Sequence, residues 1–186
     1  MVWVIVAILV IAVVVLAVML LRSQRSRRLQ QDFGPEYGRA IEQHGDRKAA
    51  EADLSDRRER RSKLEIRPLD PAARENYAER WQATQRRFVD QPAPAVADAD
   101  ELVTEVMRER GYPVSDDFEE RASDVSVDHP VVVEHYRAAH DISQRTTEGD
   151  TGTEDLRQAM VHFRALFEDL LGDEEREPIH ATRESE

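Results

Sequence analysis

The sequence predicts an all-α protein with an N-terminal transmembrane helix, a charged helical spacer and a small helical bundle. Residues 2–21 form one uncharged, strongly apolar run. Charged residues make up 34% of the 186 residues and aromatic residues only 6%, which favours helices with polar outer faces over a sheet of β-branched strands. Beyond residue 70, apolar residues recur at intervals of three and four, which is the period of an amphipathic helix.

Five segments follow from these patterns. They are a transmembrane helix over residues 1–21, a basic cytoplasmic flank over 22–31, a joint and charged helical spacer over 32–67, a helical bundle domain over 68–172 and a disordered acidic tail over 173–186. The bundle segment is long enough to enclose one modest core. Cysteine is absent from the sequence, which excludes disulfides and thiolate metal ligands.

The run from Val2 to Leu21 is the strongest signal in the chain. At about 1.5 Å per residue, twenty helical residues cover the roughly 30 Å of a bilayer's hydrocarbon core. A cleaved signal peptide is the competing interpretation, but it needs a basic leading region, a shorter apolar stretch and a small-residue cleavage site in polar surroundings. The sequence has none of these features, so we expect a single-pass anchor.

Four cations directly after the run indicate its orientation. Arg22, Arg25, Arg27 and Arg28 form the membrane flank, and such residues tend to stay on the cytoplasmic side. We therefore expect a protein of the cell membrane with its N-terminus outside and its body in the cytoplasm; the reverse topology is the alternative. Trp3 then falls at the outer interface as an anchor, unless it is only apolar filler.

The stretch after the flank is predicted to be a joint followed by a spacer. Gly34-Pro35 should break the helix, and a short helix should then run to His44 and stop at Gly45. The next helix runs from Arg47 to about Glu65 with Asp46 as its N-cap. Its acid-before-base pairs at spacing four are Asp53/Arg57, Asp56/Arg60 and Glu59/Lys63. Because this helix is polar nearly all round, we interpret it as a solvent-bridging spacer; a helix lying across the domain surface is the alternative.

Four longer helices are predicted for the bundle. The first runs from Pro71, capped by Asp70, to about Asp90, and the second from about Ala95, after a turn at Pro92 and Pro94, to Arg110. A short acidic turn around Asp116 to Ser123 follows the second helix. The third runs from an Asp128 cap to a stop at Gly149, and the fourth from Thr151 or Thr153 to Gly172. Their apolar stripes should enclose a core of Trp81, Phe88, Leu102, Val106, Tyr136, Phe163 and Phe167. The pattern leaves the order of the helices open.

Histidines are the best candidates for metal binding or catalysis in this sequence, but their spacing gives this hypothesis little support. His135, His140 and His162 lie in predicted helices, but His135 and His140 are five residues apart, whereas paired metal ligands on a helix are three or four apart. The sequence has no nucleophile or phosphate-binding motif, so we predict no catalytic, cofactor-binding or metal residue. The alternative is a helical ligand-binding or hydrolytic domain that uses these histidines with nearby carboxylates.

The net charge points to the class of partner. The chain carries −12, and because the flank contributes +4, the remainder carries −16. An acidic surface repels nucleic-acid phosphates, so we expect no nucleic-acid partner and favour a basic or neutral protein. The leading hypothesis is a membrane-tethered interaction module, an adaptor or scaffold without catalytic activity. Its oligomeric state stays open.

A group of short sequence motifs resembles a family of uncharacterised, single-pass, membrane-anchored helical bacterial proteins. The motifs are Phe33 to Tyr37, His44 to Arg47, Trp81 with Phe88-Val89-Asp90, and Leu102-Val103 through Met107 to Arg110-Gly111-Tyr112-Pro113. The resemblance covers about Phe33 to Leu171. It implies the same anchored helical architecture and brings no activity, cofactor or catalytic residue with it.

Overall fold

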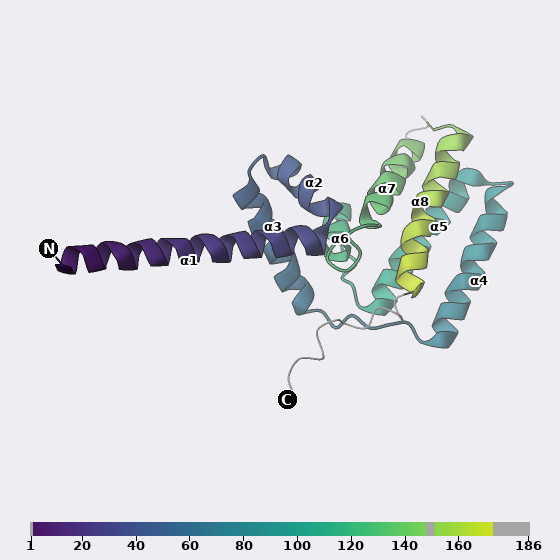
Figure 1. Cartoon of the computed structure of the whole chain (residues 1–186). Helices are drawn as coiled ribbons and strands as arrows, with labels where there is room; N and C mark the ends of the chain where they lie inside the picture. The colour runs from purple at the N-terminus through teal and green to yellow at the C-terminus, as the bar shows by residue number, and fades with distance from the viewer. Residues whose placement is uncertain (1, 148–150, 173–186) are drawn as a thin grey trace. The chain divides into compact units, whose positions relative to one another are not determined.

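The computed structural model describes residues 2–147 and 151–172, and this part of the chain is all-α, as predicted. Its eight helices are α1 (Val2–Phe33), α2 (Pro35–His44), α3 (Arg47–Ser62), α4 (Pro71–Phe88), α5 (Pro92–Arg110), α6 (Phe118–Val125), α7 (Val133–Thr147) and α8 (Thr153–Gly172) (Figure 1). The predicted stop at Gly149 and the predicted tail over 173–186 lie outside the described residues. Contacts divide the chain into two compact units, up to Arg58 and from Glu59 onward, and each is described by itself.

Helix α1 contains the apolar run and continues beyond it to Phe33. It is the one helix of the described residues that is long and apolar enough to cross a membrane. The qualifying stretch begins at Leu9, and only 6% of its most apolar window is buried inside the chain, which separates it from the core helix of a soluble protein. A secretory signal helix would meet the same criteria of length and composition.

Two glycines shape the joint after α1, as predicted. Gly34 separates α1 from α2 with a φ of 46°, and Pro35 occupies the first turn of α2. Gly45 ends α2 in the left-handed conformation, and its backbone N–H donates to Ile41 O at 2.9 Å. Asp46 then caps α3 by accepting from the Ala49 backbone N–H at 3.0 Å. These local devices allow α2 and α3 to fold back after α1.

The prediction that α3 is polar all round and bridges through solvent is wrong for one face of this helix. Ala50 and Leu54, four residues apart, are completely buried, and Arg57 lies on the same side. Hydrogen bonds join α3 to the polar end of α1, including Ser26 to Glu51 at 2.6 Å. This face therefore contains only two buried apolar residues, Ala50 and Leu54, and its other contacts are polar.

Helix α3 is also shorter than expected, since it ends at Ser62 and not near Glu65. The chain from Glu65 to Arg67 runs along the end of α5, where the Arg67 N–H donates to Arg110 O at 2.9 Å. Gly111 makes this approach possible. Its φ is 96°, and a Cβ at this position would stand 2.6 Å from Glu65 O.

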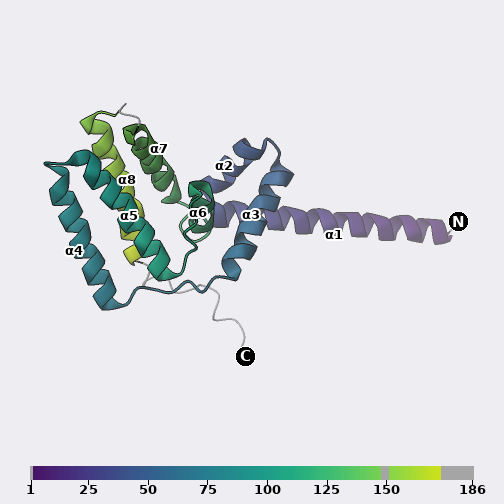
Figure 2. The same cartoon turned by 180° about the vertical axis from the view of Figure 1, so that it is seen from behind.

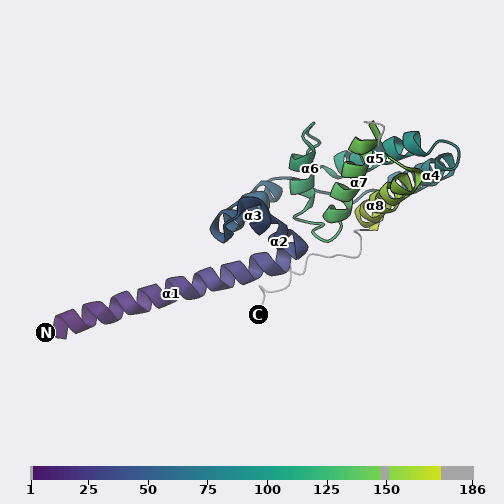
Figure 3. The same ribbon diagram turned by 90° about the horizontal axis from the view of Figure 1, so that it is seen from above.

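In the second unit, α4, α5, α7 and α8 pack together around one core. Helix α8 packs against both α5 and α7, and α5 packs against α4. Figures 1 and 3 show α8 between α7 and α4. Of the predicted core, six residues are buried in one cluster: Trp81, Leu102, Val106, Tyr136, Phe163 and Phe167. Phe88 packs against this cluster and is only partly buried.

Several helix starts in the bundle differ from the prediction. Asp70 caps α4 as expected, but α5 begins at Pro92, because a proline fits the first turn of a helix as well as a turn before it. The predicted acidic turn around Asp116 to Ser123 contains helix α6, which Asp117 caps by accepting from the Glu120 N–H at 3.1 Å. Short helices with few apolar residues leave little periodicity to detect.

The two remaining starts involve caps that the sequence misassigned. Asp128 does not cap α7, which begins five residues later at Val133. In α8, neither threonine is the N-cap: the Gly152 carbonyl accepts the first helical hydrogen bond, from Leu156 at 3.2 Å. The Asp155 carboxylate accepts from the Gly152 N–H at 3.2 Å, so the reciprocal half of a capping box closes this end.

Candidate functional site

The four flank arginines lie on the last turns of α1, and all four are exposed. Arg25 is the one held by a described neighbour, since its Nη2 donates to Ser55 Oγ of α3 at 2.8 Å. Trp3, at the other end of α1, is also exposed. These placements are compatible with contact between the flank and headgroups, and the membrane roles of the flank and of Trp3 stay predictions.

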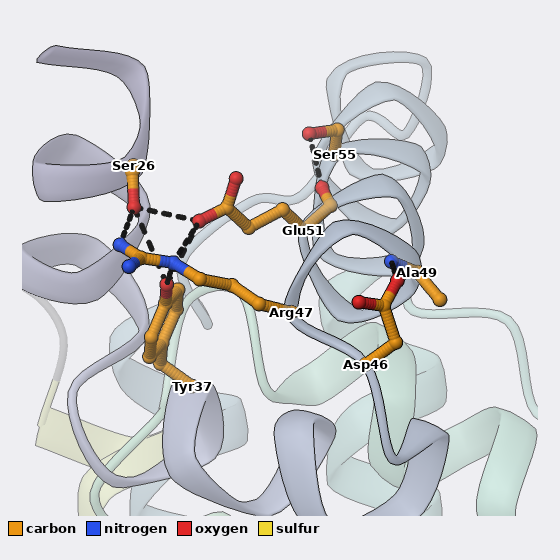
Figure 4. A network of polar contacts seen from close by, with 7 residues as sticks. All are labelled: Ser26, Tyr37, Asp46, Arg47, Ala49, Glu51 and Ser55. Atoms are coloured by element: carbon orange, nitrogen blue, oxygen red, sulfur yellow. Dashed lines mark hydrogen bonds and ion pairs between the residues drawn. The ribbon is translucent and has the colours of Figure 1, made fainter. Parts of the chain in front are cut away.

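A polar cluster ties the end of α1 to α2 and α3 (Figure 4). Glu51 Oε1 accepts three hydrogen bonds, from Ser26 Oγ at 2.6 Å, Tyr37 Oη at 2.8 Å and Arg47 Nε at 2.9 Å. Arg47 Nε also donates to Tyr37 Oη at 2.9 Å, and its Nη2 donates to Ser26 Oγ. Each of the three helices therefore supplies at least one member of the cluster, which we call the Glu51 cluster.

The cluster stabilises charged forms of its two ionisable ends. Burial raises the pKa of Glu51, but hydrogen bonds from Ser26, Tyr37 and Arg47 outweigh burial, so the net pKa lies below its usual value. Hydrogen bonds to Glu51 and Tyr37 raise the pKa of Arg47. Because the pKa of the Glu51 carboxyl is lowered on folding, its stabilising contribution is present above the carboxyl's unfolded pKa and is lost as the pH falls through the folded value.

A second ion pair in the same unit is almost fully buried. Arg57 Nη1 lies 3.3 Å from Glu36 Oε2, and the two side chains are only 7% and 1% exposed. Arg57 Nη2 also pairs with Asp53 at 2.7 Å, as the predicted spacing of four implied. A charge with so little exposure needs its partner, so this pair locks α2 to α3.

A basic hollow of about 510 Å³ opens beside the Glu51 cluster. Its lining is Arg22 and Arg25 from α1 together with Asp46, Arg47, Lys48, Glu51 and Ala52 from α3 and its cap. The sequence predicts Arg22 and Arg25 only as part of the membrane flank and does not indicate that Arg47 and Lys48 lie beside them. Only the return of the chain through α2 places cations from residues 47 and 48 next to those from 22 and 25.

The bundle carries an apolar groove between α4 and α8. Two hollows of about 180 and 280 Å³ share Gln85 and Arg164, and we call them together the α4–α8 groove. They are lined by Ala78, Trp81, Gln82, Gln85 and Phe88 of α4 and by Arg157, Met160, Val161, Arg164, Phe167, Glu168 and Leu171 of α8. The rings of Trp81 and Phe167 stack with centroids 4.6 Å apart, which gives the groove an aromatic wall.

The charges around this groove are paired within α8. Arg157 binds Glu154 at 2.6 Å, and Arg164 binds Glu168 at 2.7 Å. The Trp81 Nε1–H, in contrast, is buried and has no hydrogen-bond acceptor among the described residues. The groove therefore offers apolar surface with little net charge of its own.

The structure brings two of the three histidines of the alternative hypothesis together. His135 Nδ1 and His162 Nδ1 are 2.9 Å apart on α7 and α8, and burial together with the neighbouring His135 lowers the pKa of His162. His140 lies elsewhere, stacked on Phe118 with ring centroids 3.6 Å apart. Burial lowers the pKa of His140, and Asp100, an acid whose own pKa burial raises, partly opposes this effect.

A chain of polar contacts inside the bundle is not evident from the sequence. His129, completely buried, contacts Asp169 through Nδ1 at 2.5 Å and the Tyr112 hydroxyl through Nε2 at 3.2 Å. The Tyr112 hydroxyl donates to Asp128 at 2.6 Å, and Arg61 pairs with Asp128. The nearest sequence signal is Asp128, which is predicted above to cap the third bundle helix. Because His129 is buried, we interpret these polar contacts as part of the structure of the bundle.

The described residues contain no group of three or more histidine, aspartate or glutamate side chains that could hold a metal ion. Comparison of the chain with protein-family models, with curated proteins and with solved structures found no match. The resemblance to anchored bacterial proteins therefore stays a prediction.

Proposed function

We propose that the protein is a membrane-tethered interaction module. Its apolar N-terminal run crosses the cell membrane with the N-terminus outside, and its bundle binds a cytoplasmic protein through the α4–α8 groove. The observation that carries this proposal is the groove itself, an apolar surface left open between helices whose other faces pack into one core.

The anchor half of the proposal is supported by α1. The apolar stretch of this helix is almost wholly exposed, and exposed leucine, valine and isoleucine side chains over such a length are costly in water. The cations that begin at Arg22 follow the run directly, which favours a cytoplasmic body.

The partner is a helix with an apolar stripe and neutral or basic flanks. Salt bridges already neutralise the arginines of the groove, so they offer little to an acidic ligand, while the acidic excess of the chain beyond the flank repels one. An apolar helix face fits a groove walled by Trp81 and Phe167.

Topology is the first part to test, and the absence of cysteine makes the test simple. Val89 is 82% exposed, so Val89→Cys gives a single accessible thiol in the bundle. With a membrane-impermeant maleimide, we expect labelling only after the cells are permeabilised, and the chain should be recovered in the membrane fraction. Labelling of intact cells would show the body outside, and recovery in the soluble fraction would refute the anchor.

The groove is tested by a charge placed in it. Val161 is exposed and lines the groove, so Val161→Arg should leave the fold intact and bury an unpaired cation under a bound helix. With a photo-crosslinker at Gln85, in cells, we expect the yield of the crosslink to a partner helix to fall about tenfold or more, which corresponds to about 1.4 kcal/mol.

Val131→Arg is the matched control, because Val131 is also exposed but lies outside the groove. The control should keep the crosslink. Equal losses in both variants would assign the effect to net charge, and a crosslinked peptide that is acidic or lacks an apolar stripe would overturn the proposed partner class.

A ligand-binding or hydrolytic domain is the second candidate, and the contact between His135 and His162 is the observation that favours it. The pair supplies two nitrogen ligands, whereas catalytic zinc sites use three protein ligands. Binding of a divalent metal by the purified protein, lost in His162→Ala without unfolding, would favour this candidate over the interaction module.

A further inference from the structure

We propose that the basic hollow between α1 and α3 binds the phosphate headgroup of an anionic membrane lipid. The inference depends on the membrane crossing of α1 proposed above. It adds a built site, with a ligand class of its own, to what would otherwise be a run of flanking cations.

The composition of the hollow fits a phosphate-bearing ligand. Four cations, Arg22, Arg25, Arg47 and Lys48, surround about 510 Å³ together with two carboxylates, which leaves a net lining charge of +2. Arginine presents several N–H donors in a plane that matches phosphate oxygens, and lysine adds a mobile point charge. A volume of this size accommodates a glycerophosphate group.

The two carboxylates are already engaged within the protein. Asp46 accepts from the Ala49 N–H as a helix cap, and Glu51 Oε1 is the shared acceptor of the Glu51 cluster (Figure 4). The cations are used unevenly. Arg47 is committed to Glu51, Tyr37 and Ser26, whereas Arg22 and Lys48 form no hydrogen bond or ion pair with any described residue. Two unpaired cations therefore face a hollow whose acids are occupied.

The position of the hollow along α1 selects a lipid over a free phosphate. Arg22 follows Leu21, the last apolar residue, and Arg25 lies about one helical turn further on, roughly 4.5 Å along the axis. A helix that crosses the bilayer up to Leu21 places both side chains at the depth of lipid headgroups. The Arg47 to Ser26 hydrogen bond holds the start of α3 at the same level.

The test uses the full-length protein in nanodiscs, made either from phosphatidylcholine alone or from phosphatidylcholine doped with phosphatidylglycerol. Lipid retained by the extracted protein is measured by native mass spectrometry. We expect the wild-type chain to retain phosphatidylglycerol preferentially. The double variant Arg22→Gln/Lys48→Gln should reduce the retained phosphatidylglycerol about tenfold, because it removes the two cations of the hollow that can turn their N–H donors to a phosphate without breaking a contact to the described residues.

Arg27→Gln/Arg28→Gln is the matched control, since it removes the same charge from exposed flank residues that do not line the hollow. Retention in this control should stay close to wild type. Equal losses in the two double variants would reduce the effect to general flank electrostatics and overturn the built site.

Two further outcomes separate this inference from the proposed anchor and from the other source of phosphate. A chain that enters nanodiscs but shows no lipid preference refutes the hollow and leaves the anchor standing, whereas a chain that does not enter them refutes both. Inorganic phosphate added to phosphatidylcholine discs should not bind the wild-type protein measurably. Tight binding of that ion, lost in Arg22→Gln/Lys48→Gln, would overturn the lipid assignment.

Discussion

Phe163→Ala is expected to destabilise the bundle by about 3–5 kcal/mol, because it removes a large apolar side chain and leaves a cavity. Phe163 is completely buried in α8, next to Tyr136, with ring centroids 6.3 Å apart in an edge-to-face arrangement. Small domains have about 5–15 kcal/mol of total stability, so the loss is a large fraction of it. Urea unfolding in mild detergent measures the change, followed by tryptophan fluorescence in a Trp3→Phe background that leaves Trp81 as the reporter.

Trp81 is a suitable reporter because it is buried and stacks on Phe167, so its emission should shift when the bundle opens. The control is Val161→Ala, two residues from Phe163 on the exposed side of the same helix. It should change the free energy of unfolding by less than about 0.5 kcal/mol. A loss of this size for Phe163→Ala as well would contradict the position of Phe163 in the core.

The bundle could be predicted from sequence because its signals are periodic and redundant. In α8, Leu156, Met160, Phe163, Phe167 and Leu170 recur at helical spacing, and all of them are buried. Errors of one or two residues at either end do not disturb such a stripe. The same reasoning located Trp81 on the inner face of α4.

The start of α7 and the position of α3 were beyond sequence reasoning for a different reason. Asp128 has the composition of a helix cap, but its carboxylate is used by Tyr112 and Arg61, which are remote in the sequence. The local sequence favours Asp128 as a helix cap, but its tertiary contacts hold the carboxylate elsewhere. For α3, the sparse apolar residues indicated an exposed helix, because a one-dimensional pattern does not reveal that charged residues such as Arg57 are paired inside.

The candidate sites show the same division. The flank cations at Arg22 and Arg25 were evident as charges, but the hollow that they line requires Lys48, which the turn at Gly45 brings near them. The groove was even harder to predict from the sequence. Trp81 and Phe167 were correctly predicted to be apolar core residues, and the sequence does not show that the space beside them stays open. Patterns predict which faces are apolar, and packing determines which of these faces are left uncovered.

Arg57→Ala is expected to cost about 3–5 kcal/mol of local stability in the first unit, because it removes the guanidinium that pairs with the buried Glu36 carboxylate at 3.3 Å and with Asp53 at 2.7 Å. Glu36 is only 1% exposed, so little water can replace the guanidinium. Hydrogen exchange of the α2 and α3 amides, measured on the full-length protein in nanodiscs, reports the loss. Arg58→Ala is the control, since Arg58 pairs with Asp32 at the surface with side chains 44% and 56% exposed, and it should cost less than about 1 kcal/mol.

The double variant Glu36→Met/Arg57→Met distinguishes a stabilising ion pair from a buried charge that merely needs a partner. Replacing both charges by apolar side chains of similar length removes the desolvation penalty together with the attraction, so most of the stability lost in Arg57→Ala should return. If the double variant exchanged as fast as Arg57→Ala, the pair itself would stabilise the junction of α2 and α3. Recovery would mean that the pair adds little net stability compared with apolar side chains at the same two positions.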